Sequence, residues 1–386
     1  MSNHTNAARE NLSDVSLSRR HTMQLAGGFA AASLAAAPIY RRAFAQGATP
    51  EATPEASPVI GGGADPQMQE VLDALVAFGA PPLSNVSPFA GRNLPSFRDA
   101  VQSVLAERGE TIIEPVGGIE HILIPSLDGE TELVARIYHP EGAGSDLLPV
   151  MVYFHGGGFV IANLNTYDAS CRALANATGT IVASIAYRLA PENPFPTAVD
   201  DAYAATQFFM GGAGVVGGDP ERVIVAGESA GGNLATVVCL RARDEGGMMP
   251  LHQVLVYPVT TFAPEGESLE SIQEYANAIP LGAADLEWFG MHYLADPSDA
   301  TNPYASPLLA TDLSGIPPVT MIQAEIDPLQ SQGTAYADAL EAAGVTVSRT
   351  LYEGVTHEFF GMTTVVDKAA EAVAQVASEV NAALGS

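Results

Sequence analysis

The feature that most constrains this chain is a serine between glycines, placed where a strand-like run gives way to a helix-like run. Residues Val223–Val238 read VIVAGESAGGNLATVV. The first half is apolar and β-branched, which favours a buried strand, and the second half has the composition of a helix. A serine at such a junction occupies a strained turn, and Gly227 and Gly231 avoid collisions between strand and helix. Ser229 is therefore a candidate nucleophile.

A serine hydroxyl is a weak nucleophile and needs a general base, which itself needs an orienting acid. The histidines that follow Ser229 are His252, His292 and His357. His252 opens a predicted strand, and His292 lies inside a long insertion. His357 follows the last predicted strand, in a loop from which its side chain can reach the strand ends. We therefore interpret His357 as the base.

The acid is expected between the serine and the histidine, since Ser, acid, His is the chain order of one class of serine hydrolase. Asp327 comes just after a predicted strand and before Pro328. Glu325 is the nearest competitor, and Asp312 precedes the strand. Asp327 is the predicted partner of His357.

Three glycines in VYFHGGGFV, Val152–Val160, follow another predicted strand. Alone, this pattern fits a tight turn or a phosphate-binding loop. Next to a serine nucleophile, it fits a loop whose backbone N–H groups stabilise an oxyanion. We predict that Gly157, Gly158 and Ala230 donate these N–H groups, and that His155 holds the loop in place.

Strand-like and helix-like runs alternate along most of the chain after residue 140, which predicts an α/β fold with a largely parallel sheet. The two runs before Pro140 lack an intervening helix and predict an antiparallel start. The eight predicted strands are Ile119 to Ile124, Glu132 to Tyr138, Val150 to Phe154, Thr180 to Ala186, Arg222 to Ala226, Gln253 to Tyr257, Val319 to Ala324 and Thr346 to Tyr352. Helices are predicted at Asp168 to Ala177, Pro196 to Phe209, Ala230 to Arg243, Gly333 to Ala343 and Val366 to Leu384.

The N-terminal region has a different composition. Residues 1–45 carry Arg19 and Arg20 before a short apolar run and end in Ala43-Phe44-Ala45, which predicts a signal peptide of the Tat type, cleaved before Gln46. Sec export and an uncleaved membrane anchor remain open. Residues 46–64 are rich in Pro, Thr and Glu and predict a disordered linker.

The folded domain is predicted at 65–386. Residues 65–115 should form helices, and 261–317 separate two predicted strands by about twice the usual spacing. A long connection of this kind is typical of a cap or lid.

A net charge of −28 from 44 acidic and 16 basic residues argues against binding to nucleic acid. The two cysteines, Cys171 and Cys239, lie in apolar helical surroundings, which predicts two separate buried thiols.

Five ordered motifs carry a family resemblance: HGGGF, YRLAPENPFPTAVDD, GESAGGN, EIDPL and GVTHEFFGM. Together they resemble the hormone-sensitive-lipase-like bacterial esterases of the α/β-hydrolase superfamily. The resemblance implies an α/β-hydrolase fold, with a mostly parallel eight-stranded sheet flanked by helices and an N-terminal helical cap. It also implies ester hydrolysis through an acyl-serine, with Ser229 as nucleophile, His357 as general acid and base, and Asp327 as its orienter, and with no metal and no organic cofactor.

Two departures from the family pattern are Glu228 in place of the more usual aspartate, and Gln330-Ser331-Gln332 after the acid. Tyr187, Arg188 and Glu192 of YRLAPE are expected to be structural, with the arginine in a scaffold ion pair.

The leading hypothesis is an exported carboxylesterase, periplasmic or extracellular, that acts on small esters of short to medium acyl chains. It would be a monomer or homodimer, without stable membrane insertion after signal cleavage. Lactones, amides or carbonates are alternative substrates, because they share the acyl-serine step. A non-catalytic ligand-binding protein of the same fold is a weaker alternative, since His357 is present.

Overall fold

A sheet of eight strands runs through the described residues in the order β1-β2-β4-β3-β5-β6-β7-β8. β1 pairs antiparallel with β2 and β2 with β4, and all later pairs are parallel. The predicted mostly parallel sheet with an antiparallel start is confirmed. The strands are β1 Gly118–Pro125, β2 Glu132–His139, β3 Leu148–Phe154, β4 Ile181–Ile185, β5 Gly218–Glu228, β6 Gln253–Val256, β7 Val319–Ile326 and β8 Val347–Thr356.

The computed structural model describes residues 63–263, 266 and 269–385 of the 386-residue chain. The predicted signal peptide at 1–45 and most of the predicted linker at 46–64 lie outside the described residues. Within the described residues, no helix is both long and apolar enough to cross a membrane.

The sheet is buried on both faces because its central strands are apolar throughout. In β3, Val150, Val152 and Phe154 join one core cluster, while Met151 and Tyr153 join the other. This alternation follows from the two-residue period of a strand. Continuous apolar strands of this kind are typical of a parallel sheet covered by helices.

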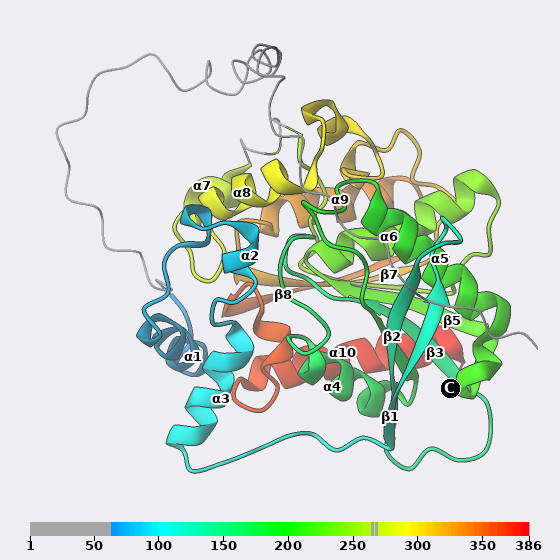
Figure 1. The fold of residues 1–386 in the computed structure, drawn as a ribbon, viewed down its shortest axis with the longest axis horizontal. Helices are drawn as coiled ribbons and strands as arrows, with labels where there is room; N and C mark the ends of the chain where they lie inside the picture. Colours follow the sequence, from blue (N-terminus) through cyan, green and yellow to red (C-terminus); the bar gives the residue numbers. More distant parts are fainter. Residues whose placement is uncertain (1–62, 264–265, 267–268, 386) are drawn as a thin grey trace, which may run out of the picture. The chain divides into compact units, whose positions relative to one another are not determined.

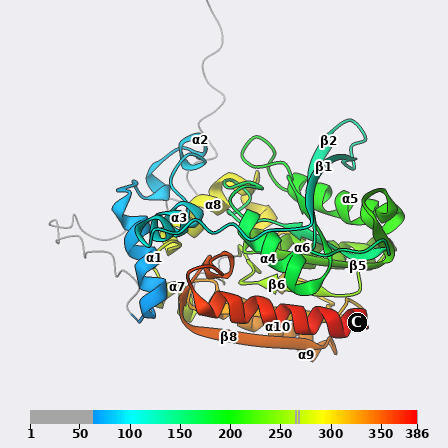
Figure 2. The same ribbon diagram turned by 90° about the horizontal axis from the view of Figure 1, so that it is seen from below.

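Helices α5 Thr197–Gly212, α6 Ala230–Glu245 and α9 Gln330–Ala342 cover one face of the sheet. Helices α4 Asp168–Thr178 and α10 Asp367–Leu384 cover the other face, and Figure 1 shows the two sets on opposite sides. α10 runs alongside β8 in Figure 2. Cys171 in α4 and Cys239 in α6 are free and buried, so the prediction of two separate thiols is confirmed.

The region before the sheet forms α1 Pro66–Ala77, α2 Pro88–Gly91 and α3 Phe97–Glu107. Asp65 caps α1 by accepting a hydrogen bond from the Met68 N–H at 2.8 Å, and Pro66 occupies the first turn, as is common at helix starts. α1 and α3 pack into the same core cluster as α4 and α10.

The insertion at 261–317 contains α7 Glu270–Glu274 and α8 Ala283–Tyr293 among its described residues. The Trp288 indole N–H of α8 donates to the backbone carbonyl of Val86 at 3.0 Å. The insertion and the N-terminal helices therefore meet, and in Figure 1 α8 lies close to α2.

Four parallel strands end directly before residues that the sequence singled out. β3 ends at Phe154, β5 at Glu228, β7 at Ile326 and β8 at Thr356. Carboxyl ends of parallel strands lie at one edge of a sheet, where α/β folds place their sites. This edge therefore holds the candidate site.

Candidate active site

Ser229 lies in a strained turn between β5 and α6, with φ 56° and ψ −117°. A non-glycine residue with positive φ costs roughly 1–3 kcal/mol and persists only where its surroundings fix it. Here the backbone fixes it: the Ser229 N–H donates to Val256 O at 2.9 Å, and the Val259 N–H donates to Ser229 O at 3.2 Å. The hydroxyl-bearing residue is thus held by the loop that leaves β6.

The glycine at 231 is required by close packing of backbones. A Cβ on Gly231 would lie 1.9 Å from the carbonyl oxygen of Phe154, at the end of β3. A Cβ on Gly227 would lie 2.2 Å from Gly231 O. Neither obstacle is a side chain that can rotate away, so both positions admit only glycine.

Asp327 and His357 form a buried pair at the ends of β7 and β8. His357 Nδ1 lies 2.7 Å from Asp327 Oδ2, and the other carboxylate oxygen accepts the Leu329 N–H at 2.8 Å. Asp327 is fully buried and His357 is 3% exposed. Burial lowers the pKa of His357, but the Asp327 charge and hydrogen bond raise it, and the balance lies above the ordinary value. Such a pair is suited to accept a proton.

The alternatives to Asp327 and His357 have other partners. Glu325 accepts the Gly354 N–H at 2.6 Å, which ties β7 to β8. His252 lies 2.8 Å from the Thr320 hydroxyl, and His292 packs its ring against Trp288 in α8. Asp312 accepts the Ser314 N–H in a surface turn.

Tyr257, in the loop after β6, connects the serine turn with the histidine. Its ring centroid lies 4.5 Å from that of His357. Its hydroxyl donates to Glu228, the residue before Ser229, and Tyr153 donates to the other oxygen of the same carboxylate. Burial raises the pKa of Glu228, and the two phenols act in the opposite direction. Glu228, which departs from the family pattern, is thus a buried carboxyl group whose two oxygens each accept a hydrogen bond from a tyrosine hydroxyl.

The loop His155–Val160 brings Gly157 and Gly158 to the same edge. Both glycines and Ala230 are buried, and within the described residues no hydrogen bond uses the N–H groups of these three residues. Buried N–H groups without a partner are rare in proteins. An oxyanion-binding site requires such N–H groups, because they can donate to the charged oxygen of the substrate.

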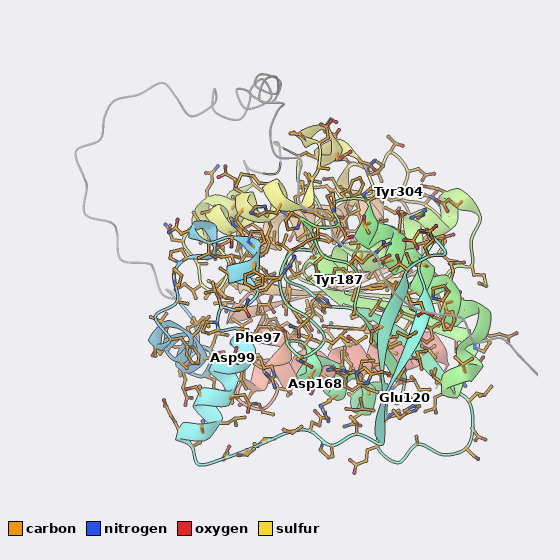
Figure 3. The ribbon with its side chains drawn as sticks, viewed as in Figure 1. Phe97, Asp99, Glu120, Asp168, Tyr187 and Tyr304 are labelled. Atoms are coloured by element: carbon orange, nitrogen blue, oxygen red, sulfur yellow. The ribbon has the colours of Figure 1, made fainter. Side chains whose placement is uncertain are left out.

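Side chains from other elements hold this loop. The hydroxyl of Tyr187, labelled in Figure 3, donates to His155 O at 2.7 Å, and its ring stacks on the His155 ring at 4.4 Å. Burial lowers the pKa of His155 to about 4, so its imidazole is neutral near pH 7. The expectation that His155 supports the loop fits this geometry.

Two aromatic residues explain why the loop carries glycine at 156 and 158. A Cβ on Gly156 would lie 2.2 Å from the Tyr167 hydroxyl oxygen, and a Cβ on Gly158, at φ +57°, would lie 2.1 Å from the Phe289 ring. Tyr167 precedes α4, and Phe289 belongs to α8. Each glycine therefore leaves room for an aromatic side chain from a distant segment.

Arg92, after α2, attaches the N-terminal helices to the loop. Its guanidinium donates to Val160 O at 2.8 Å and to Ala190 O at 2.7 Å, and it binds both carboxylate oxygens of Glu192. Arg188 instead pairs with Asp201, 2.6 Å away, and with Asp128, 2.9 Å away. Arg188 and Glu192 of YRLAPE are therefore both in ion pairs, as expected, but they are not partners of each other.

Glu358, Tyr167, Tyr257, Arg92 and Phe289 were not identified from the sequence. Only Glu358 had a local signal, because it directly follows His357 in VTHEFF. The other four reach the site from elements whose contacts depend on the tertiary fold. No group of three or more His, Cys, Asp or Glu in the described residues is arranged to hold a metal ion.

Comparison with known proteins places the chain in a family. A family model described as alpha/beta hydrolase fold matches residues 151–361. Carboxylic ester hydrolase LipN of Mycobacterium tuberculosis is 42% identical over 250 residues, which are 63% of this chain and 65% of LipN, just under two thirds of its length. Ethyl acetate hydrolase of Pseudomonas putida is 39% identical over 261 residues, 67% of this chain and 80% of that protein.

A solved structure agrees with these matches. The esterase of Pyrobaculum calidifontis superposes with a TM-score of 0.72 at 37% identity, covering 83% of this chain and 98% of that chain. The chain belongs to the α/β-hydrolase superfamily, in the hormone-sensitive-lipase-like group of carboxylesterases.

Proposed function

We propose that the protein is a serine carboxylesterase that hydrolyses small esters of short to medium acyl chains. The observation that carries the proposal is the buried hydrogen bond between Asp327 and His357 at the sheet edge where Ser229 occupies its strained turn. The names of the relatives, which include an ethyl acetate hydrolase and a carboxylic ester hydrolase, support esters as the substrate class.

In the proposed reaction, His357 takes the hydroxyl proton of Ser229 as the serine oxygen attacks the ester carbonyl carbon. The carbonyl oxygen becomes negative and is stabilised by the N–H groups of Gly157, Gly158 and Ala230. His357 then donates its proton to the leaving alcohol, and the carbon–oxygen bond of the ester breaks to give an acyl-serine.

Water completes the cycle by the same chemistry. His357 accepts a proton from the attacking water as the water oxygen bonds to the acyl carbon. It then returns this proton to the Ser229 oxygen as the acyl-serine bond breaks, which releases the carboxylic acid and restores the free serine. Asp327 keeps the imidazole oriented and stabilises its charged form throughout, since its second oxygen is already fixed by the Leu329 N–H. The apolar ring of Phe289 beside Gly158 supports an apolar acyl group as the substrate.

Replacement of Ser229 by Ala tests the proposal. Turnover of p-nitrophenyl acetate and butyrate should vanish while the circular dichroism spectrum and thermal midpoint stay close to those of the parent protein. Ser298→Ala, at an exposed serine, is the matched control and should keep full activity. Activity retained by Ser229→Ala would overturn the mechanism.

We also propose that residues 1–45 direct export by the Tat pathway. The support is the pair Arg19-Arg20 before an apolar run with a small-residue cleavage pattern. N-terminal sequencing of protein recovered from the periplasm or medium should begin at Gln46. Active protein that remains in the cytoplasm and begins at Met1 would contradict this proposal.

A further inference from the structure

A second carboxyl group lies beside His357, on the ring atom that Asp327 does not contact. Glu358 Oε1 is 3.9 Å from His357 Nε2, whereas Asp327 binds Nδ1. Nε2 is the nitrogen that must exchange protons with the serine and the alcohol in a triad of this type. Glu358 is therefore close to the atom where the proton moves.

The backbone at Glu358 is strained to put this side chain there. Its φ is 73°, in the left-handed region that glycine adopts freely and other residues adopt at a cost of roughly 1–2 kcal/mol. A glycine at this position would remove the cost but also the carboxyl group. Backbone strain that persists at a functional site is a reason to propose a function for the strained residue.

Tyr167 fixes one oxygen of the Glu358 carboxyl and leaves the other without a donor. The Tyr167 hydroxyl donates to Glu358 Oε1 at 2.7 Å. Glu358 Oε2 is buried and has no hydrogen-bond partner among the described residues. A buried carboxylate with an unsatisfied oxygen is costly unless a positive charge compensates it.

The charged and titratable groups around Glu358 come from several elements. They are His357 from the end of β8, Asp327 from the loop after β7, Glu228 from the end of β5, Tyr257 from the loop after β6, and Tyr167. Burial raises the pKa of Glu358 to about 7, the His357 charge lowers it, and Glu228 raises it. Among these neighbours only His357 becomes positively charged. Ionised Glu358 and charged His357 thus favour each other.

We propose that Glu358 is a positioning residue for His357, whose carboxylate stabilises the imidazolium on the Nε2 side while Asp327 stabilises it on the Nδ1 side. The inference rests on the proposed esterase mechanism, in which the imidazolium forms during both half-reactions. Because neutral His357 gains little from a nearby carboxylate, this stabilisation acts mainly on the charged species formed during reaction.

The expected effect has a definite sign. Removing a negative charge near Nε2 lowers the pKa of His357, since an opposite charge within about 4–6 Å raises such a pKa by about 1–3 units. The acid limb of the kcat/KM profile against pH reports the joint titration of His357 and Glu358. It should therefore move about one pH unit lower. KM for a neutral ester should change little.

The variant is Glu358→Gln, whose amide oxygen can still accept the Tyr167 hydrogen bond. The measurement is kcat and kcat/KM for p-nitrophenyl butyrate from pH 5 to 9, read at the isosbestic wavelength of the phenol and phenolate. Glu371→Gln, at an exposed site on α10, makes the same charge change away from the site and should leave the profile unmoved. A lower acid limb and a kcat reduced about tenfold would support the proposal.

A drop in kcat at all pH values with an unmoved acid limb would show a merely structural role and overturn the proposal. If Glu358→Gln does not fold, Glu358→Asp takes its place, because its shorter carboxylate lies farther from Nε2. A smaller downward shift then supports the proposal, and an unmoved limb overturns it. Ser229→Ala measured in parallel separates the two claims: if it stays active, the esterase mechanism itself fails.

Discussion

The two turns that supply the proposed oxyanion donors are built in different ways. The turn at Ser229 is enclosed by backbone: Gly231 meets the carbonyl oxygen of Phe154, and the serine exchanges hydrogen bonds with residues at 256 and 259. The loop His155–Val160 has backbone hydrogen bonds at Gly157 O and Phe159 O. At Gly156 and Gly158 it is enclosed by the side chains of Tyr167 and Phe289, and Tyr187 and Arg92 bind its carbonyl groups.

This difference predicts different tolerances. Backbone atoms cannot rotate away, so a collision in the serine turn must displace a strand or a helix. Side chains can change rotamer, so mutation of Gly156 or Gly158, whose nearest neighbours are side chains, should cause a graded loss of activity with the fold kept.

The largest effect is expected for Gly231→Ala. The new methyl group would lie 1.9 Å from Phe154 O, so β3 and α6 must separate, at a cost above about 4 kcal/mol in the free energy of unfolding. The variant should be insoluble or melt far below the parent by thermal unfolding. Gly211→Ala in α5 is the matched control, since its Cβ has only Met248 at 3.8 Å. If Gly231→Ala folds with parental stability, the backbone account of this turn is wrong.

Gly158→Ala should fold but lose about 100-fold in kcat, the usual cost of disturbing one oxyanion donor. The methyl group collides with the Phe289 ring, and positive φ disfavours alanine. Gly158→Ala combined with Phe289→Ala should recover part of the lost kcat, because the ring is removed. Steady-state kinetics on the two single variants and the double variant check this. No recovery would mean that backbone strain alone accounts for the loss.

Lowering the pH should reduce the contribution of His155 to the stability of the fold. Because burial lowers the folded-state pKa of His155 to about 4, its stabilisation is complete above the unfolded value near 6.5 and is lost as pH falls toward 4. The stability of the parent relative to His155→Asn should therefore drop by about 2 kcal/mol between pH 7 and pH 5. Urea unfolding at both pH values measures it, with His121→Asn at an exposed histidine as control. A pH-independent difference would contradict a neutral, buried His155.

The smallest effect is expected for Arg92→Met, which keeps the apolar stem but loses the bonds to Val160 O and Ala190 O. We expect kcat to fall about tenfold, on the order of the 1.5–3 kcal/mol of a charged hydrogen bond, with the fold retained. Arg108→Met is the matched control, because Arg108 binds only the exposed Glu70 among the described residues. If the two variants have equal kcat values, Arg92 does not support the loop.

Much of the fold followed from local pattern. The eight predicted strands all exist, and the helices begin or end within a few residues of the predicted ones, because period-two burial and helix-forming runs are properties of short segments. Ser229, Asp327 and His357 each stand directly after a strand, so their chain order sufficed to select them. Glu325 is the nearest competitor of Asp327 in the sequence, and the structure shows that its carboxylate instead accepts the Gly354 N–H.

The partners of the glycine-rich loop did not follow from local pattern. Trp288 contacts Val86 from 202 residues away, and Arg92 reaches Glu192 across 100 residues. The sequence also contains no signal that relates Tyr167 to Gly156 or to Glu358. Contacts of this separation depend on how complete helices pack.

By itself, the sequence determined the positions of strands and helices, the glycines of the serine turn and the residues that carry the proposed chemistry, because sterics and hydrophobic period act over a few residues. The tertiary structure decided which side chains surround those residues: Tyr257 on His357, Phe289 on Gly158, and Glu358 with Tyr167 beside the imidazole. The physical reason is that charge and burial at a site come from every element packed there.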